Sequence, residues 1–262
     1  MKRVLLCLAL LLLTLQPLAA QSADSTRDSN WREDVDFLWK NIQSIHPDPF
    51  RVTSQATFEQ MVSDLDAQIP TLSDAQIAVR LFEIIAALRD GHSSLWFQQT
   101  VYPLRYYPLY FYPFSDGVYL IQAAPEYADW VGARLVQIGS SDMTQVVAQV
   151  DPLGPRDNDF SGLVTLPMRL SLADVLLGTG IITDEAQPAF VLERADGEQI
   201  TLNPAPESFS AFSASIPLQW RLPKAALPLS LSRIDEGFWW TYLDGDQVIY
   251  VQYNQVTARS AG

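Results

Sequence analysis

Residues 116–139 read DGVYLIQAAPEYADWVGARLVQIG, and this stretch decides how the middle of the chain folds. The pair Asp116-Gly117 is a turn dipeptide, and the apolar, partly β-branched run after it is typical of a strand. Tyrosines and phenylalanines crowd residues 102–114 on the other side of the turn. We therefore expect two paired strands around the turn, with a further strand over residues 133–138.

The elements after this stretch extend the same module. They are a short helix that opens at Ser141 or Asp142 and runs to Val150, a helix over residues 171–177 that stops at Gly178, and a hairpin of residues 190–192 with residues 200–202 around Ala195-Asp196-Gly197. Residues 95–203 are therefore predicted to form a β-rich module with two helices.

Three amphipathic helices are predicted before this module. Apolar residues recur at steps of three and four within residues 31–45, 58–69 and 77–88. Capping boxes are predicted for the second helix, with Thr57 and Gln60, and for the third, with Ser73 and Gln76. Asp90-Gly91 ends the third helix. We expect a small helical bundle over residues 21–94.

The C-terminal part differs in texture. The stretch 204–230 holds five prolines and is predicted to be a semi-rigid connector: Pro204, Pro206, Pro217, Pro223 and Pro228. Residues 238–242 and 248–253 then flank Asp244-Gly245 as another hairpin, within residues 231–262. The predicted fold class is α+β: a three-helix bundle, a β-rich module with two helices, and the opening hairpin of a further, incomplete unit.

The first twenty residues are typical of a secretory signal peptide. Lys2 and Arg3 precede an apolar run over residues 4–15, and Ala20 is the expected cleavage site. The run is about twelve residues long, whereas a bilayer span needs roughly 20, so an uncleaved anchor is the less favoured alternative. We expect export to a periplasm or outside the cell, with no membrane span after cleavage.

Composition excludes several classes of function. The chain has 17 Lys and Arg against 30 Asp and Glu, a net charge of -13, which argues against a nucleic-acid partner. The single Cys, Cys7, lies in the signal peptide, so the exported chain has no thiol chemistry. Only His46 and His92 are present, without the spacing of metal ligands. Phosphate-binding glycine loops are absent, so we expect no metal and no cofactor.

The segment Asp90-Gly91-His92-Ser93-Ser94 holds the residue types of a catalytic triad. Triad groups must converge in space, and near neighbours in sequence cannot normally aim at one another. We therefore expect a helix-ending turn in which His92 holds the local backbone.

Other candidate catalytic groups are equally weak. Glu33/Asp34 and Asp64/Asp66 are predicted to lie on solvated helix faces. After signal cleavage the only lysines are Lys40, on a helix, and Lys224, in the connector, and neither is a convincing base for a serine nucleophile. No catalytic residue is assigned.

The order of segments carries more information than any single motif. Five features follow one another along the chain: His46-Pro47-Asp48-Pro49-Phe50, the helix ending Leu88-Arg89-Asp90-Gly91-His92-Ser93, the strand after Asp116-Gly117, the stretch Gly132-Ala133-Arg134-Leu135-Val136-Gln137-Ile138-Gly139, and the strand from Val248 to Asn254. In this order they resemble the N-terminal helical region, the PDZ-like module and the first core strand of the tail-specific, or carboxyl-terminal processing, serine peptidases. The resemblance covers residues 31–254.

The resemblance implies an exported endopeptidase in which a Lys activates a Ser, and a PDZ-like module, residues 95–203, that recognises the C-terminal region of a polypeptide. In the family, the Ser and the Lys follow a Gly-rich stretch in the core. That stretch is absent here, so the 262 residues are expected to be inactive by themselves, and the substrate-binding residues stay unknown.

Three interpretations remain open. The favoured one is the N-terminal portion of a serine peptidase, because residues 248–253 form a hydrophobic strand without the sheet that would cover it. The second is a complete, non-catalytic peptide-binding module. The third is a lipid- or pigment-binding protein that uses the aromatic residues 102–114. It is the weakest, because such clusters more often serve as core.

Overall fold

The computed structural model describes residues 25–216, 228–243, 245 and 247–255. The predicted signal peptide, the prolines Pro217 and Pro223 and the turn residue Asp244 lie outside these residues. The backbone contacts divide the chain into two compact units, up to Ile216 and from Pro217 onward. Helices combine with antiparallel strands, which confirms the α+β class. Among the described helices, none is long and apolar enough to cross a membrane.

Three helices open the first unit: α1 (Ser25–Ile45), α2 (Gln55–Gln68) and α3 (Asp74–Ala86). The predicted capping box of Ser73 and Gln76 is confirmed at α3. The one predicted at Thr57 is wrong, because Ser54 caps α2 and its hydroxyl accepts from the Thr57 N–H at 3.2 Å. Ser54 stands before the first turn, where the unpaired N–H groups lie, whereas Thr57 is already inside that turn.

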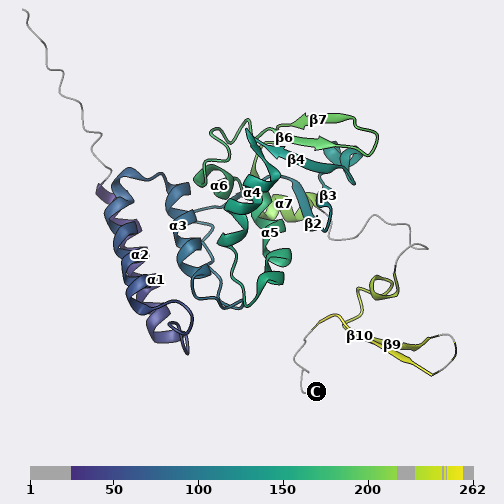
Figure 1. Cartoon of the computed structure of the whole chain (residues 1–262), viewed down its shortest axis with the longest axis horizontal. Coiled ribbons are helices and arrows are strands. Elements are labelled where there is room, and N and C mark those ends of the chain that lie inside the picture. Colours follow the sequence, from purple (N-terminus) through teal and green to yellow (C-terminus); the bar gives the residue numbers. More distant parts are fainter. Residues whose placement is uncertain (1–24, 217–227, 244, 246, 256–262) are drawn as a thin grey trace, which may run out of the picture. The chain divides into compact units, whose positions relative to one another are not determined.

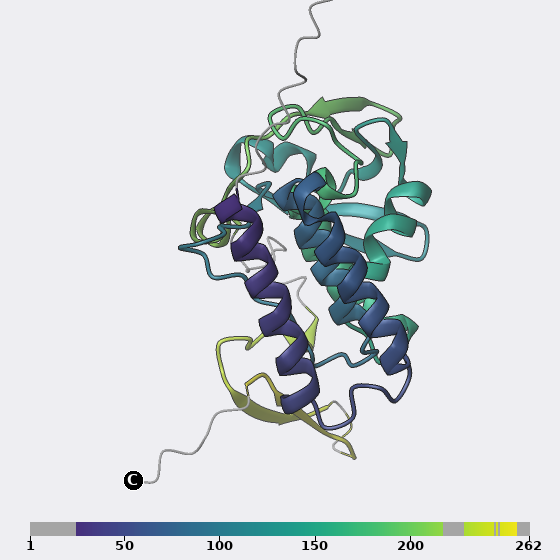
Figure 2. The same cartoon turned by 90° about the vertical axis from the view of Figure 1, so that its left-hand side faces the viewer.

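The helices enclose an apolar core whose aromatic part is the group Trp39, Phe50 and Phe58, with ring centroids 5.9–6.2 Å apart. α3 is buried on most of its surface, since it packs on α2 and on α6 (Ala173–Gly178) of the sheet-bearing part. Figure 2 shows the helices in front of that part. α3 is therefore shared between the helical core and the sheet-bearing part, which is possible because most of its residues are apolar.

The sheet has the strand order β2-β3-β4-β6-β7, and β5 pairs with β4. The strands are β2 (Leu109–Phe114), β3 (Gly117–Ala123), β4 (Arg134–Ile138), β5 (Ser141–Asp142), β6 (Phe190–Glu193) and β7 (Gln199–Leu202). Phe114 lies opposite Gly117, so the predicted hairpin is confirmed, but its loop is Ser115-Asp116 rather than Asp116-Gly117, and Gly117 is the first residue of β3. The 190–202 hairpin is confirmed in the same way.

Two longer helices, α4 (Met143–Val150) and α5 (Gly162–Ser171), accompany α6. α4 begins at Asp142, which forms a capping box with Gln145. α5 is not predicted from the sequence because Pro167 lies inside it. The proline leaves the carbonyl of Leu163 without its helical N–H partner, and Leu163 is an exposed residue, so water can hydrate this group.

The first unit extends past residue 203. β1 (Arg105–Tyr106) pairs with β8 (Glu207–Ser208), and α7 (Phe209–Ser215) follows, capped by Ser208. Residues 207–215, which the proline count assigns to a connector, therefore form a strand and a helix. The short 3-10 helices are η1 (Ile69–Thr71), η2 (Pro125–Trp130), η3 (Asp151–Leu153), η4 (Asp159–Ser161) and, in the second unit, η6 (Leu229–Leu231).

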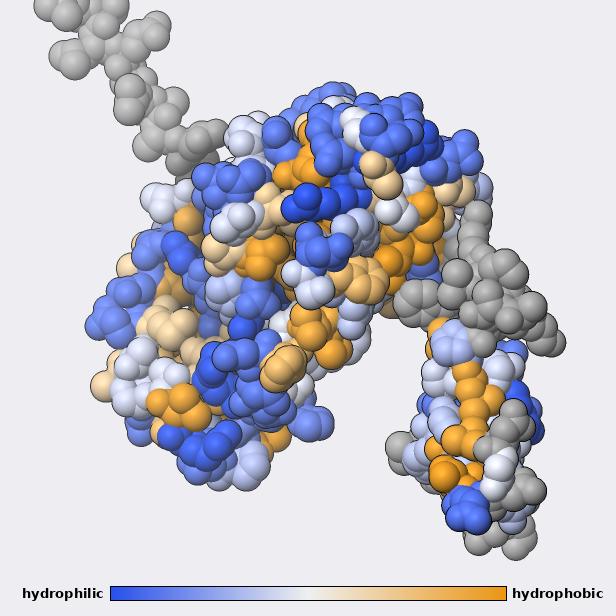
Figure 3. Space-filling model, turned by 45° about the vertical axis from the view of Figure 1, so that its right-hand side comes forward, coloured by the Kyte–Doolittle hydropathy of each residue, from blue (hydrophilic) through white to orange (hydrophobic). Residues whose placement is uncertain are grey.

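The second unit contains the predicted hairpin, β9 (Phe238–Tyr242) with β10 (Ile249–Tyr253) (Figure 1). One face carries three cross-strand pairs of exposed apolar side chains: Phe238 with Tyr253, Trp240 with Val251, and Tyr242 with Ile249. Figure 3 shows hydrophobic residues along this hairpin. On the opposite face, Trp239 packs against Tyr250 with tilted rings, and the guanidinium of Arg233 lies over the Trp239 ring.

Candidate functional site

Asp90 organises the turn after α3. Its carboxylate accepts from the Ser93 hydroxyl at 2.6 Å, from the His92 backbone N–H at 3.1 Å and from the His46 ring at 3.3 Å. The hydrogen bond from Ser93, followed by that from His92, lowers the pKa of the Asp90 carboxyl. The expectation that His92 holds the backbone is wrong, because its ring is 93% exposed and Asp90 makes the contacts.

His46 joins the two motifs that carry the family resemblance. Its Nδ1 accepts from the Asp48 N–H at 3.2 Å, so the proton resides on Nε2, which faces Asp90. His46 is therefore a satisfied polar residue, as predicted from its place near a helix end. The contact ties the end of α1 to the end of α3 and contains no free nucleophile.

No triad exists at this turn. The Ser93 hydroxyl donates to Asp90 rather than to a histidine, so no base is placed to activate it. Lys40 pairs with Asp36 on the exposed face of α1, and Lys224 lies outside the described residues. Among the described residues, no group of three potential ligands could hold a metal ion.

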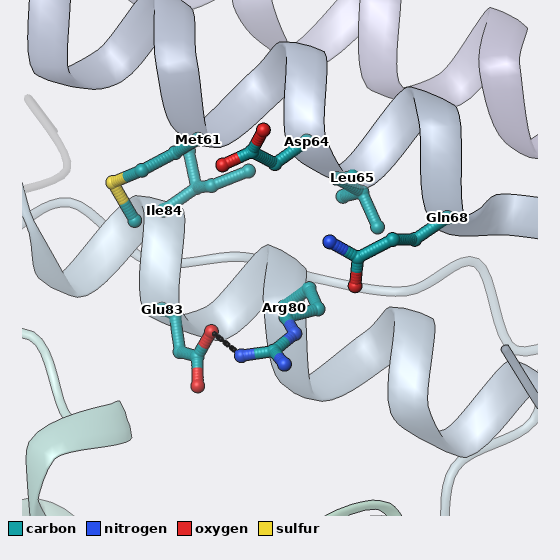
Figure 4. A pocket seen from close by; sticks show the side chains of 7 residues that line it. All are labelled: Met61, Asp64, Leu65, Gln68, Arg80, Glu83 and Ile84. Carbon is teal, nitrogen blue, oxygen red and sulfur yellow. Dashed lines mark hydrogen bonds and ion pairs between the residues drawn. The ribbon is translucent and has the colours of Figure 1, made fainter.

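A cleft of about 240 Å³ between α2 and α3 is lined by both polar and apolar side chains (Figure 4). Its two charged groups on α3, Arg80 and Glu83, pair with each other at 2.9 Å. Asp64, on α2, accepts a hydrogen bond from Gln60 at 2.7 Å. Each charged group of the cleft therefore has a hydrogen-bond partner within its own helix, and none is arranged as an acid–base pair with another across the cleft.

The edge of the sheet at β2 is the most informative feature for function. Both backbone groups of Leu120, on β3, are hydrogen-bonded to residues 132–133. Its N–H donates to the Ala133 carbonyl at 3.0 Å, and its carbonyl accepts from the Gly132 N–H at 2.8 Å. In an antiparallel pair the residue opposite, Phe111, then directs its own N–H and C=O away from β3. In the described part of the chain, no strand pairs with this edge.

One end of that edge is occupied by the chain itself. The Ser171 carbonyl accepts from the Tyr107 N–H at 2.7 Å, and the Ser171 hydroxyl donates to the Leu109 carbonyl at 2.5 Å. α5, which ends at Ser171, packs beside β2. Pro113 lies further along the strand and is typical of an edge position, since it has no N–H to pair. Phe111 itself is fully buried, so the accessible stretch of this edge is residues 112–114.

The aromatic residues that could have formed a ligand site serve mainly as core. Tyr107 and Phe111 are fully buried, and both pack on Phe190 at 5.1 and 5.6 Å between ring centroids. Burial raises the pKa of Tyr110, which lies half-buried on β2. The structure therefore agrees with the interpretation of this cluster as core.

Two polar residues of α5, Ser171 and Arg169, have structural roles that the sequence does not predict. Ser171 lies at the end of a helix that the proline hides. Arg169, two residues earlier in α5, packs over the Phe82 ring of α3 at 5.5 Å, and burial, followed by the charge of Arg156, lowers its pKa to about 10. Only the buried position of such polar residues shows their role, and no local pattern in the sequence reports it.

The fold is similar to a solved structure of mature CPAF complexed with lactacystin. The two match with a TM-score of 0.51 and 16% sequence identity, over 70% of this chain and 35% of that chain. CPAF is a chlamydial tail-specific-like serine protease. The likeness concerns the fold over the matched residues, and the chain spans about a third of the matched structure. No family model and no curated protein sequence matches the chain.

Proposed function

We propose that the chain is the N-terminal portion of an exported serine endopeptidase of the tail-specific type, and that it recognises the C-terminal region of its polypeptide substrates. The order of the sequence motifs supports this proposal, and so does the likeness to the protease CPAF. In this proposal the described residues supply recognition, and a peptidase core supplies the Ser and the Lys.

The open edge of β2 is the observation that carries the recognition role. An extended peptide can add to such an edge as a further strand, held by main-chain hydrogen bonds. On the accessible stretch, Pro113 offers a carbonyl as acceptor and no N–H, whereas the backbone groups of Phe111 are buried. Residues 95–203 would then work as the PDZ-like module that the sequence predicts.

The β9–β10 hairpin supports the second half of the proposal. Its six exposed apolar side chains form one continuous face, and isolated two-stranded hairpins are at best marginally stable in water. Such a face requires further sheet or helix to cover it. A peptidase core that begins at this hairpin would provide that cover.

The alternative function is a non-catalytic peptide-binding module. It is favoured by one observation: the β2 edge lies entirely in the unit up to Ile216, so binding there needs no catalytic core. This alternative shares the peptide-binding test with the first proposal and differs from it in the catalytic test.

Peptide binding is tested with C-terminal peptides whose backbone is modified while the protein is left intact. We expect a peptide with a free carboxylate to bind more tightly than its amidated twin, measured by fluorescence anisotropy. N-methylation at the residue facing Pro113, whose N–H would donate to the Pro113 carbonyl, should weaken binding, whereas N-methylation of the next residue, whose N–H points outward, should have little effect. Equal losses from both modifications would contradict strand addition.

Catalysis is tested separately. A reading frame that continues beyond Gly262 into a Gly-rich stretch, a Ser and a Lys would support the peptidase, and a stop codon there would support the binding module. The 262 residues themselves are expected to leave unstructured polypeptide uncut. Time-dependent cleavage that a serine-directed inhibitor abolishes would show that this expectation is wrong.

A further inference from the structure

A second concave site lies in the first unit, away from β2. It is a cavity of about 300 Å³ between α1, α3 and the segment 95–102 that follows the Asp90 turn. Its lining is mostly aromatic and aliphatic: Trp31, Asp34, Phe37, Leu38, Asn41, Leu81, Leu95, Trp96, Phe97, Gln98, Val101 and Tyr102. This volume and this composition are typical of a site for a small ligand.

The inner wall is built from rings whose polar ends are already bonded. Trp31 and Tyr102 pack edge to face, with centroids 5.4 Å apart. The Tyr102 hydroxyl donates to the buried Asp174 at 2.8 Å, and the Trp31 N–H donates to Asp74 at 2.8 Å. Because these polar atoms are engaged, the two side chains contribute mainly hydrophobic surface and π-electron density to the cavity.

The mouth of the cavity exposes large apolar side chains. Phe37 of α1 is 68% exposed and Trp96 of the segment 95–102 is 84% exposed. Single exposed apolar residues are normal, but here two aromatic residues belong to one cavity lining. A ligand with an apolar body would cover surface that is otherwise in contact with water.

Asp34 is the only charged residue in the lining. In the described part of the chain its carboxylate has neither a hydrogen bond nor an ion pair, whereas the neighbouring Asp36 pairs with Lys40. Partial burial, followed by the charge of Glu33, raises the pKa of Asp34. The groove on the other side of α1 differs, because two of its three carboxylates have basic partners: Asp66 pairs with Arg32, and Asp36 pairs with Lys40.

We propose that this cavity binds an organic cation with an apolar body, its ammonium group beside Asp34 and its body against the aromatic side chains. Two features select the cation. The unpaired carboxylate favours a positive charge, and the faces of tryptophan and tyrosine rings attract cations as well. An anion of the same shape would instead meet Asp34 without any basic residue in the lining.

The test uses 2-phenylethylamine as the probe and 3-phenylpropionate as an anion of nearly the same shape. We expect the amine to bind the purified protein with a Kd in the millimolar range, roughly what a ligand of this size achieves. Amide chemical shifts should change at α1 and at residues 95–102, and 3-phenylpropionate should bind at least about fivefold more weakly. Equal affinities, or shift changes confined to other elements, would overturn the proposal.

Variants locate the charge and the rings. Asp34→Asn should weaken binding of the amine about fivefold and should not weaken binding of 3-phenylpropionate. Glu33→Gln, which removes a charge one residue away and outside the lining, should change the affinity for the amine less than twofold. Trp96→Ala should weaken binding of the amine about threefold and should leave the fold intact, because the ring is exposed. An unchanged affinity in both Asp34→Asn and Trp96→Ala would refute the site, whatever the outcome of the peptide test at β2.

Discussion

Replacing Asp174 tests the reasoning about the buried polar groups behind the sheet. Asp174 is 2% exposed, and its carboxylate accepts from the Tyr102 hydroxyl at 2.8 Å and from the Arg105 backbone N–H at 2.9 Å. The Arg105 guanidinium lies 3.6 Å away and also pairs with Glu185. The carboxylate therefore connects α6 to the start of β1 and to the segment 95–102.

The two possible truncations differ in what they leave unpaired. In Asp174→Asn the amide oxygen can still accept from the Arg105 N–H, and the Tyr102 hydroxyl can turn to accept from the amide, so we expect a loss of about 1–2 kcal/mol. In Asp174→Ala both donors lose their acceptor in a buried place and a small cavity forms, so we expect about 3–4 kcal/mol.

The assay is urea unfolding followed by far-UV circular dichroism. The chain provides a matched control at Asp116, which accepts from the Tyr119 hydroxyl at 3.0 Å in an exposed place, and Asp116→Ala should cost less than about 0.5 kcal/mol. If Asp174→Ala costs no more than Asp174→Asn, or no more than the exposed control, the buried carboxylate does not stabilise the fold in this way.

Three further predictions follow from single features. Arg89→Gly should raise stability by about 0.5 kcal/mol in thermal unfolding, because φ at Arg89 is 53°, and Arg89→Ala should not. The folded-state pKa of Asp90 is lowered from its ordinary value of 3.8, so the ionised carboxylate stabilises the fold above pH 3.8 and this contribution is lost as pH falls through the lowered pKa. The urea midpoint should therefore fall less steeply with decreasing pH in Asp90→Asn than in the unmodified protein. Trp240→Lys with Val251→Glu should reduce self-association in light scattering, and Thr241→Lys on the other face should not.

The parts of the fold that local rules govern are predictable from the sequence. The box at Ser73 and Gln76, the cap at Asp142 and the loop before Gly117 each depend on a few neighbouring residues. Where two local rules compete, sequence analysis fails. Thr57 satisfies the spacing of a capping box, but Ser54 is the residue at the first unpaired N–H groups. α5 is hidden because the rule that proline ends helices ignores how α5 packs against β2.

The site is less predictable than the fold, because its members are distant in sequence. The contact of His46 with Asp90 spans 44 positions, and that of Ser171 with Leu109 spans 62. A triad among adjacent residues is correctly excluded from the sequence, but the residue that holds the turn after α3 is Asp90 rather than the predicted His92. Composition can indicate that polar groups are available, and only the fold decides which of them are buried together.

The way Ser171 closes one end of the β2 edge has a consequence for the proposed recognition of peptides. Phe111 is buried and Pro113 has no N–H, so an added strand gains one backbone hydrogen bond on the accessible stretch, to the Pro113 carbonyl, worth about 1 kcal/mol net. Binding by the isolated module should therefore be weak. In a longer enzyme the same edge would act on a substrate already held by the core, where a high effective concentration replaces intrinsic affinity. Weak binding at β2 is thus what the proposed peptidase requires, whereas an independent binding module would need additional contacts along the peptide.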